Sequence, residues 1–345
     1  MIAASPGDET VDAAVVRLAA GLAGSAVQRM AQLGGGRNSR VYRVETAAGV
    51  YALKLYPSPA EDARDRLGVE TAALRWMEAH GFAMTPRVIS TDRDHDAVLL
   101  SWADGELVRD GVGATEVDQA CGFLGRLHGL RDTPAVPPDH LATEACLSAA
   151  EIERQLRSRI GSLRELEEPE LTRFLDSEVE PALLTRLDRA RTAIAAAGGA
   201  YADDLPSSRR SQVPSDFGFH NALRDAEGRL TFIDFEYFGW DDPAKLTADI
   251  LLHPGTPVGD NERARLHSGL LDIYGDDPGF AARLDALSPL LGLRWGLILL
   301  NEFRPERWRR RVMAGATETW AAAKQRQLAA ARQMLDKHAA SRRFG

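Results

Sequence analysis

Two segments of the chain are the most informative, Pro214-Ser215-Asp216-Phe217-Gly218-Phe219-His220-Asn221 and, further along, Phe232-Ile233-Asp234-Phe235-Glu236-Tyr237. The first segment places an asparagine five residues after an aspartate. The second overlaps Leu230-Thr231-Phe232-Ile233-Asp234-Phe235, which is rich in β-branched and aromatic residues. This composition predicts a short strand over 230–235 that delivers a further aspartate. Two carboxylates and one amide therefore come from one loop and one strand. Such oxygen donors are the ligands that a hard divalent cation prefers.

A glycine-rich turn lies far upstream, at Leu33-Gly34-Gly35-Gly36-Arg37-Asn38-Ser39, between two predicted strands. Glycines let backbone N–H groups approach an anion closely, although a plain hairpin loop has the same composition. The next strand runs over 51–56, and its alternation puts Ala52 and Lys54 on one face. Glu70 follows on a predicted helix, where its carboxylate can pair with Lys54 and orient it. The other acidic candidates for this pairing are Glu61, Asp62 and Glu78.

The remaining periodicity predicts a β-rich first third and a mostly helical remainder. Val11, Val15, Leu18 and Leu22 recur at helical spacing, so an amphipathic helix comes first. The ranges 41–44 and 51–56 predict a hairpin, 65–80 a helix that stops at Gly81, and 88–89 and 97–100 two more strands. From residue 115 the pattern is helical, with long helices over 148–198 and from 243 onward.

The order of glycine-rich turn, Lys54, Glu70, Asp216, Asn221 and Asp234 matches the parts with which kinases hold phosphates, magnesium and the attacking hydroxyl. At these residues the chain resembles the aminoglycoside phosphotransferase family and its choline and ethanolamine kinase relatives, over roughly residues 30 to 310. Ile233-Asp234-Phe235-Glu236-Tyr237 is similar to the choline-kinase form of the metal motif, and Asp242-Pro243-Ala244 with Asp249 is similar to the aminoglycoside-kinase continuation.

The resemblance implies an α+β, two-lobed protein-kinase-like fold. It implies a small β-rich N-terminal lobe over residues 1–100 that carries the extra helix, a hinge at 101–106, and a larger, mostly helical C-terminal lobe over 107–345. The cofactors implied are ATP or GTP with Mg²⁺. Asp216 is expected to be the catalytic base, and Asn221 and Asp234 the metal ligands. The residues expected to contact or orient the nucleotide are Gly34, Gly35, Gly36, Ser39, Lys54, Glu70, Leu100 and Trp102.

The acceptor implied is a hydroxyl of a small molecule, such as a sugar, an aminoglycoside-like antibiotic (hence a role in resistance) or a related metabolite. Only seven residues separate Asp234 from Asp242, too few for the activation loop of a protein kinase. The candidates for the acceptor site are Glu236, Trp240, Asp241 and Asp242, which read equally well as core and helix-capping groups. Two other functions stay open: a choline or ethanolamine kinase, and a pseudokinase that binds nucleotide without transferring phosphate.

One departure from the family pattern motivates the pseudokinase alternative. The family has His-Gly-Asp or His-Asn-Asp at the catalytic loop, whereas Pro214 and Ser215 precede Asp216 here. In the family this histidine holds the loop and does not touch the phosphate, and Pro214, which fixes φ, can stiffen the loop by another route. His220 is a rival base by its position beside Asn221, although the end of the loop favours a structural role.

Composition limits the partners. The 345 residues carry 42 Lys and Arg against 50 Asp and Glu, a formal charge of −8, which argues against nucleic acid and anionic membranes as partners. The basic run 304–311 is therefore expected to be a solvated helix face. Cys121 and Cys146 have no paired spacing, and no run is apolar enough to span a bilayer. We expect a cytoplasmic protein that is a monomer or homodimer.

Overall fold

The computed structural model describes residues 11–34, 39–255, 258–313 and 317–337, and it divides the chain into two compact units. Unit 1 comprises residues 1–143 and 212–240, and unit 2 comprises residues 144–211 and 241–345. The predicted hinge at 101–106 lies inside unit 1, so these units are not the two predicted lobes. The division at 101–106 stays a prediction.

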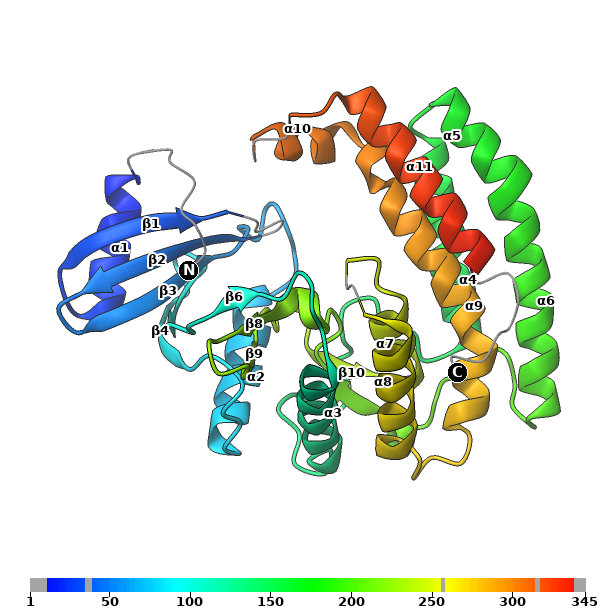
Figure 1. Cartoon of the computed structure of the whole chain (residues 1–345), viewed down its shortest axis with the longest axis horizontal. Helices are drawn as coiled ribbons and strands as arrows, with labels where there is room; N and C mark the ends of the chain where they lie inside the picture. The colour runs from blue at the N-terminus through cyan, green and yellow to red at the C-terminus, as the bar shows by residue number, and fades with distance from the viewer. Residues whose placement is uncertain (1–10, 35–38, 256–257, 314–316, 338–345) are drawn as a thin grey trace. The chain divides into compact units, whose positions relative to one another are not determined.

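Unit 1 begins with a five-stranded antiparallel sheet in the order β1-β2-β3-β5-β4 (Figure 1). The hairpin predicted around residues 41–56 is formed by β2 and β3, which pair from Arg40↔Leu55 to Thr46↔Gly49. A strand was predicted before the glycine-rich turn without bounds, and the structure forms it as β1. The bounds are β1 Val27–Leu33, β2 Arg40–Thr46, β3 Gly49–Leu55, β4 Val88–Asp92 and β5 Ala97–Ser101.

Two helices flank this sheet. The amphipathic helix α1 (Ala13–Ala23) packs on it, and Ala19 joins the apolar cluster that contains Leu53 and Leu55 of β3. Because neighbouring side chains of a strand point to opposite faces, Lys54 lies on the other face of the sheet. On that face α2 (Arg66–Ala79) contacts β4 and β5. Asp65 caps the start of α2, and Gly81 follows its end at a φ of 71°.

The rest of unit 1 is a helix and a group of short strands around an aromatic core. Phe123 of α3 stacks on Phe217 with ring centroids 5.4 Å apart, and it contacts Phe235 at 6.1 Å. These two rings directly follow Asp216 and Asp234, so one apolar anchor fixes both segments. The bounds are β6 Glu106–Leu107, α3 Ala114–Gly129, β7 Ser211–Val213, a 3₁₀ turn Phe219–Asn221, β8 Ala222–Arg224, β9 Leu230–Phe232 and β10 Gly239–Asp241.

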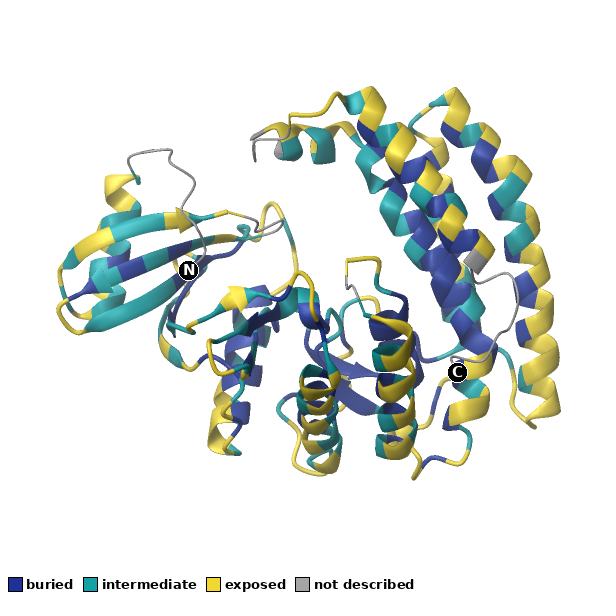
Figure 2. Ribbon diagram, viewed as in Figure 1, coloured by how far each residue is buried: buried dark blue, intermediate teal, exposed yellow. Residues whose placement is uncertain are grey.

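Unit 2 is helical in its described part. The central helix α9 packs against α4, α6, α7 and α11, and buried residues run along α9 and over all of α7 (Figure 2). The α-helices are α4 Ala149–Arg164, α5 Pro169–Phe174, α6 Glu180–Ala196, α7 Pro243–Leu252, α8 Asp260–Ile273, α9 Phe280–Leu299, α10 Pro305–Met313 and α11 Trp320–Lys337. Single turns of other helix types lie at Ser207–Arg209 and Leu300–Phe303 (3₁₀) and at Leu175–Val179 (π).

The expectation of a β-rich first third followed by a mainly helical remainder is therefore confirmed. The predicted strand at 230–235 is shorter than expected, because β9 ends at Phe232 and Asp234 takes a positive φ of 71°. Within the described residues, every helix is either too short or too polar to cross a lipid bilayer.

Candidate active site

Unit 1 contains a cluster of ion pairs, which we call the ion-pair cluster; Lys54 is at its centre, and its other members are Glu70, Asp234, Glu236 and Arg66. Its Nζ lies 2.6 Å from Glu70 Oε2 and 2.7 Å from Asp234 Oδ1. Of the four acidic candidates for its partner on or near α2, the structure brings Glu70 to it. Burial works against the charged ammonium, but the carboxylates of Asp234 and Glu70 outweigh burial and raise the pKa of Lys54 well above its ordinary value. Lys54 is therefore a fixed cation at any physiological pH.

Glu70 orients this cluster through a second set of contacts. Its Oε1 accepts a hydrogen bond from the backbone N–H of Phe235 at 3.2 Å. Its Oε2 accepts one from the Tyr56 hydroxyl. Glu70 thus ties α2 to β3 and to the segment that follows β9, and it holds Lys54 and Asp234 in one place.

Glu236 lies in the same cluster. It is buried, with its Oε2 3.2 Å from Lys54 Nζ and 3.1 Å from the Ser39 hydroxyl, which donates to it. Its Oε1 accepts a hydrogen bond from Arg66, which also binds Asp62. Burial opposes ionisation, but Lys54 and Arg66 prevail and lower the pKa of Glu236. Sequence reasoning missed Arg66. It could have been found from its spacing, because it lies one helical turn before Glu70 and the two residues therefore share one face of α2.

The cluster has an excess of carboxylates. Glu70, Asp234 and Glu236 each place an oxygen within 4.8 Å of the others. The pKa of the Asp234 carboxylate is raised to about 6, chiefly by burial. The positive charge of Lys54 lowers this pKa, whereas the negative charges of Glu236 and Glu70 raise it. Even so, 36% of the Asp234 side chain is exposed, so it is accessible to an incoming ion. Oxygen donors with surplus negative charge fit a hard divalent cation such as Mg²⁺.

The loop 214–221 lies beside this cluster because of the β8–β9 hairpin. The pair Ala222↔Phe232 puts Asn221, just before β8, at the same end as Ile233, just after β9. The Ile233 N–H donates to the Asn221 carbonyl at 2.9 Å. The Asn221 side-chain amide in turn donates to the Asp216 carbonyl at 2.8 Å. A chain of hydrogen bonds thus connects the predicted base to the segment after β9 that carries Asp234.

The Asp216 side chain is half-exposed, with 42% of its area accessible. Its Oδ1 lies 3.0 Å from His220 Nε2. Asp216 is therefore accessible to a substrate from one side and in contact with an imidazole on the other.

The model of the phosphotransferase enzyme family matches residues 29–284 of the chain. The chain belongs to this family. Members of the family are small-molecule phosphotransferases that act on a hydroxyl group, so this protein is such a phosphotransferase, as the sequence predicted. A search of curated proteins gives no match.

Solved structures agree on the fold. A spectinomycin phosphotransferase in complex with ADP and spectinomycin aligns with a TM-score of 0.60 and 11% identity, over 94% of this chain and 97% of that chain. A choline kinase from Cryptosporidium parvum aligns with a TM-score of 0.54 and 14% identity, over 90% of this chain and 89% of that chain. The two-lobed protein-kinase-like fold is thereby confirmed.

The residues predicted to form the hinge of the phosphotransferase lie at the end of its sheet. Leu100 pairs with Ala52 across β5 and β3, and Trp102 follows, with its Nε1–H donating to Asp104 at 3.1 Å. Gly105 is required here, because its φ is 124° and a Cβ at this position would lie 2.6 Å from the Arg224 carbonyl oxygen. Gly34 is exposed at the end of β1, whereas Gly35 and Gly36 lie outside the described residues.

Three predicted acceptor-site residues of the phosphotransferase are buried instead. Trp240 belongs to unit 1, and its Nε1–H points to the Val136 carbonyl at 3.4 Å. Asp241, in unit 2, accepts from the Cys146 N–H at 2.8 Å. Asp242, also in unit 2, caps α7 and binds Arg283 at 2.7 Å. All three have the core and capping roles that the sequence had left as the alternative, so in this structure they are not a rim.

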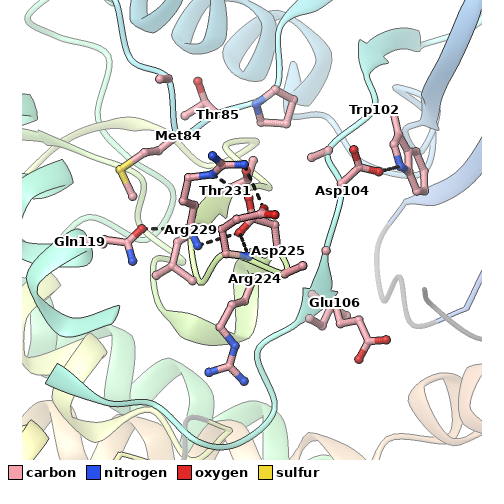
Figure 3. A pocket seen from close by; sticks show the side chains of 18 of the residues that line it. Met84, Thr85, Trp102, Asp104, Glu106, Gln119, Arg224, Asp225, Arg229 and Thr231 are labelled. Atoms are coloured by element: carbon pink, nitrogen blue, oxygen red, sulfur yellow. Dashed lines mark hydrogen bonds and ion pairs between the residues drawn. The ribbon is translucent and has the colours of Figure 1, made fainter. Parts of the chain in front are cut away.

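The phosphotransferase also has a cavity of about 1420 Å³ in unit 1 (Figure 3). Its walls are residues 82–87, the segment 101–107 and the β8–β9 turn, residues 224–231. Gln119 secures that turn by bonds to Gly228 and Leu230. Among the residues that the structure describes, Trp102 lines this cavity, but Lys54, Asp216 and Asp234 do not. The cavity is therefore separate from the ion-pair cluster.

Ser215 of the phosphotransferase has a strained backbone, with a φ of 65°. Only glycine and asparagine adopt this region readily, and the family's Gly or Asn occupies this position. The Ser215 hydroxyl donates to the Thr143 carbonyl at 3.0 Å, which offsets part of the strain. A strained backbone residue at a functional loop persists only where its surroundings fix it.

We predict that Ser215→Gly stays within about 1 kcal/mol of the unmodified free energy of unfolding, because relief of strain compensates for the lost hydrogen bond. Ser215→Val is expected to lose about 1–3 kcal/mol, since a β-branched residue resists a positive φ. Denaturant unfolding measures both. Equal stability of the two variants would mean that the backbone at 215 is not strained.

Proposed function

We propose that this phosphotransferase moves the γ-phosphoryl group of a nucleoside triphosphate to a hydroxyl of a small molecule, in the ion-pair cluster around Lys54. The observation that carries the proposal is the position of Lys54 Nζ, 2.6 Å from Glu70 and 2.7 Å from Asp234. A buried cation held between a helix carboxylate and a post-strand aspartate is the arrangement by which kinases align phosphates. We also infer that 101–106 is the hinge that meets the base.

The step assigned to the chain's own residues is positioning and proton transfer. The acceptor oxygen forms a bond to the γ-phosphorus while the bond between this phosphorus and the β–γ bridging oxygen breaks, and the nucleoside diphosphate leaves. The proton of the acceptor hydroxyl passes to the Asp216 carboxylate, whose exposure suits contact with a substrate. Lys54 supplies positive charge to the phosphate oxygens throughout.

The site is proposed to hold Mg²⁺ through Asp234 and Asn221. Magnesium, when bound with nucleotide, would offset the charge that develops on the phosphate oxygens. Asn221 donates its amide N–H to the Asp216 carbonyl, so its amide oxygen is the atom left to act as a ligand. Glu236 belongs in this proposal to the phosphate end of the site, because Lys54 and Ser39 both bind it.

The acceptor is proposed to be an uncharged or cationic small molecule that carries a hydroxyl group. The formal charge of −8 favours such a molecule over an anion. A spectinomycin phosphotransferase and a choline kinase both share this fold, so amino-cyclitols and amino alcohols are both candidates. Their shared chemistry is a hydroxyl near an amine.

The experiment that tests the proposal measures release of nucleoside diphosphate and phosphorylation of the acceptor. ATP and GTP are each supplied with and without Mg²⁺, across sugars, aminoglycosides, spectinomycin, choline and ethanolamine. Phosphorylated product that requires Mg²⁺ is expected with at least one acceptor. Tight nucleotide binding with no transfer to any acceptor or to water would instead establish a pseudokinase.

Lys54→Ala should lower turnover and weaken nucleotide binding, because the phosphates lose their cation. Glu70→Ala should do the same through Lys54, so the double variant is expected to be little worse than either single one. Glu78→Ala is the matched control, since Glu78 is exposed on the same helix. Additive losses in the double variant would show that Glu70 does not act through Lys54.

A further inference from the structure

We propose that His220 is a positioning residue of the transfer reaction: its imidazole holds the Asp216 carboxylate in the orientation in which it receives the acceptor proton. This inference rests on the proposed function and deepens it, because it assigns a role to a residue that the reaction scheme itself does not use.

The contact has a defined direction. His220 Nε2 lies 3.0 Å from Asp216 Oδ1, and an ionised carboxylate has only acceptor oxygens. The hydrogen therefore sits on Nε2, and the imidazole donates. A histidine that donates to the base cannot at the same time remove a proton with the same nitrogen. This geometry favours positioning over the alternative that His220 is itself the base.

The difference in burial also indicates that His220 positions Asp216, and not the reverse. The His220 side chain is 18% exposed, whereas Asp216 is 42% exposed. The imidazole is fixed by the 3₁₀ turn Phe219–Asn221 and by the protein around it, while the carboxylate reaches solvent. Because one carboxylate oxygen is bound to a fixed donor, rotation about the Cβ–Cγ bond is restricted. The second oxygen then occupies a defined place for a substrate.

The backbone on either side of Asp216 explains why its side chain needs this contact. The Asp216 N–H donates to the Pro214 carbonyl at 2.9 Å, and the Asp216 carbonyl accepts from Asn221. These bonds fix the main chain but leave the side-chain torsions open. Pro214 contributes no N–H donor to the loop, in a position where the family pattern has a histidine. His220 contacts the carboxylate itself.

The size of the effect follows from the bond. A hydrogen bond to a charged group contributes about 1.5–3 kcal/mol, which corresponds to about 10- to 100-fold in rate if it is needed in the transition state. We expect His220→Ala to lower kcat by that factor, while KM for nucleotide and acceptor stays within about twofold. His220→Gln should restore most of the rate, because its Nε2 amide reaches the same place as the imidazole Nε2. The shorter His220→Asn should not.

The experiment measures kcat and KM of these three variants and of Asp216→Asn, with the acceptor found in the panel or with water as acceptor for MgATP. The control is His95→Ala, which breaks an exposed His–Asp pair of the same 3.0 Å length at the turn between β4 and β5. Thermal unfolding establishes that each variant folds. If His220→Ala does not fold, the comparison of His220→Gln with His220→Asn still tests whether His220 positions Asp216.

Two outcomes would overturn the inference. Unmodified kcat in His220→Ala and His220→Asn would show that the contact has no role in the reaction. Loss in His220→Gln as deep as in Asp216→Asn would show that the imidazole itself transfers the proton. Failure of the proposed function looks different: the unmodified protein transfers no phosphate, or Asp216→Asn keeps the full rate.

Discussion

Asp234→Asn is expected to abolish Mg²⁺-dependent transfer and to remove the effect of Mg²⁺ on nucleotide affinity. Asparagine keeps the size of the side chain but loses the charge that a hard cation binds. Loss of even an outer partner of a metal costs about 10–100-fold in affinity or activity, so loss of a direct ligand should cost at least that much. Nucleotide binding without metal should weaken little, because Lys54 keeps its other partners, Glu70 and Glu236.

Calorimetric titration of nucleotide with and without Mg²⁺ measures this difference, together with the rate. Glu227→Gln, a change of the same kind at an exposed residue of the β8–β9 turn, is the control. Asn221→Ala should behave in the same way but less severely, since a neutral amide oxygen is a weaker ligand than a carboxylate. If Asp234→Asn weakens nucleotide binding equally with and without Mg²⁺, then Asp234 is not a metal ligand.

The sequence predicted the helices and strands that position the site because their local signals agree with the packing. The apolar spacing of α1 matches the cluster around Leu53 and Leu55, and strand alternation then puts Lys54 on the opposite face. The capping residue Asp65 and the glycine at 81 bound α2 as expected. Where a side chain's direction follows from a regular element, sequence reasoning could place it.

Other positions depend on backbone geometry that no periodic pattern contains. Asp234 takes a φ of 71°, so the two-residue alternation of β9 does not continue beyond it. For this reason Glu236, which the sequence placed among the acceptor-site candidates, turns inward to Lys54 and Arg66. Glu70 was named from the sequence as the partner of Lys54, and the packing of α2 against the sheet is what brings it, and not its three rivals, to the lysine.

The acidic residues after the metal motif illustrate a different limit. Asp242 before Pro243 is a typical helix N-cap, and a capping role was therefore open from the sequence alone. The sequence could not show that Arg283, far along the chain, binds the same carboxylate. Tertiary partners of this kind decide between a buried structural acid and an accessible one, and only the folded chain reveals them.

Asp216→Asn is expected to lower the transfer rate by about 10²–10⁴-fold, the usual loss when a positioned base is removed. Nucleotide and Mg²⁺ affinity should survive, because the proposal assigns the phosphate end to Lys54 and Asp234, while Asp216 contributes to the loop mainly through its backbone. The asparagine amide can still contact His220, so the loop should keep its structure and its melting temperature. Single-turnover kinetics, measured by stopped flow or quenched flow, separate the chemical step from product release.

The control is Asp139→Asn, at an exposed loop residue of the same unit. Three results are distinguishable. A large loss of rate with intact nucleotide binding supports Asp216 as the base, and an equally deep loss in His220→Gln would assign the base to the imidazole instead. Turnover of Asp216→Asn at the unmodified rate would contradict the role of the whole 214–221 loop, because the Asn221 side chain is bonded to the backbone of that one aspartate.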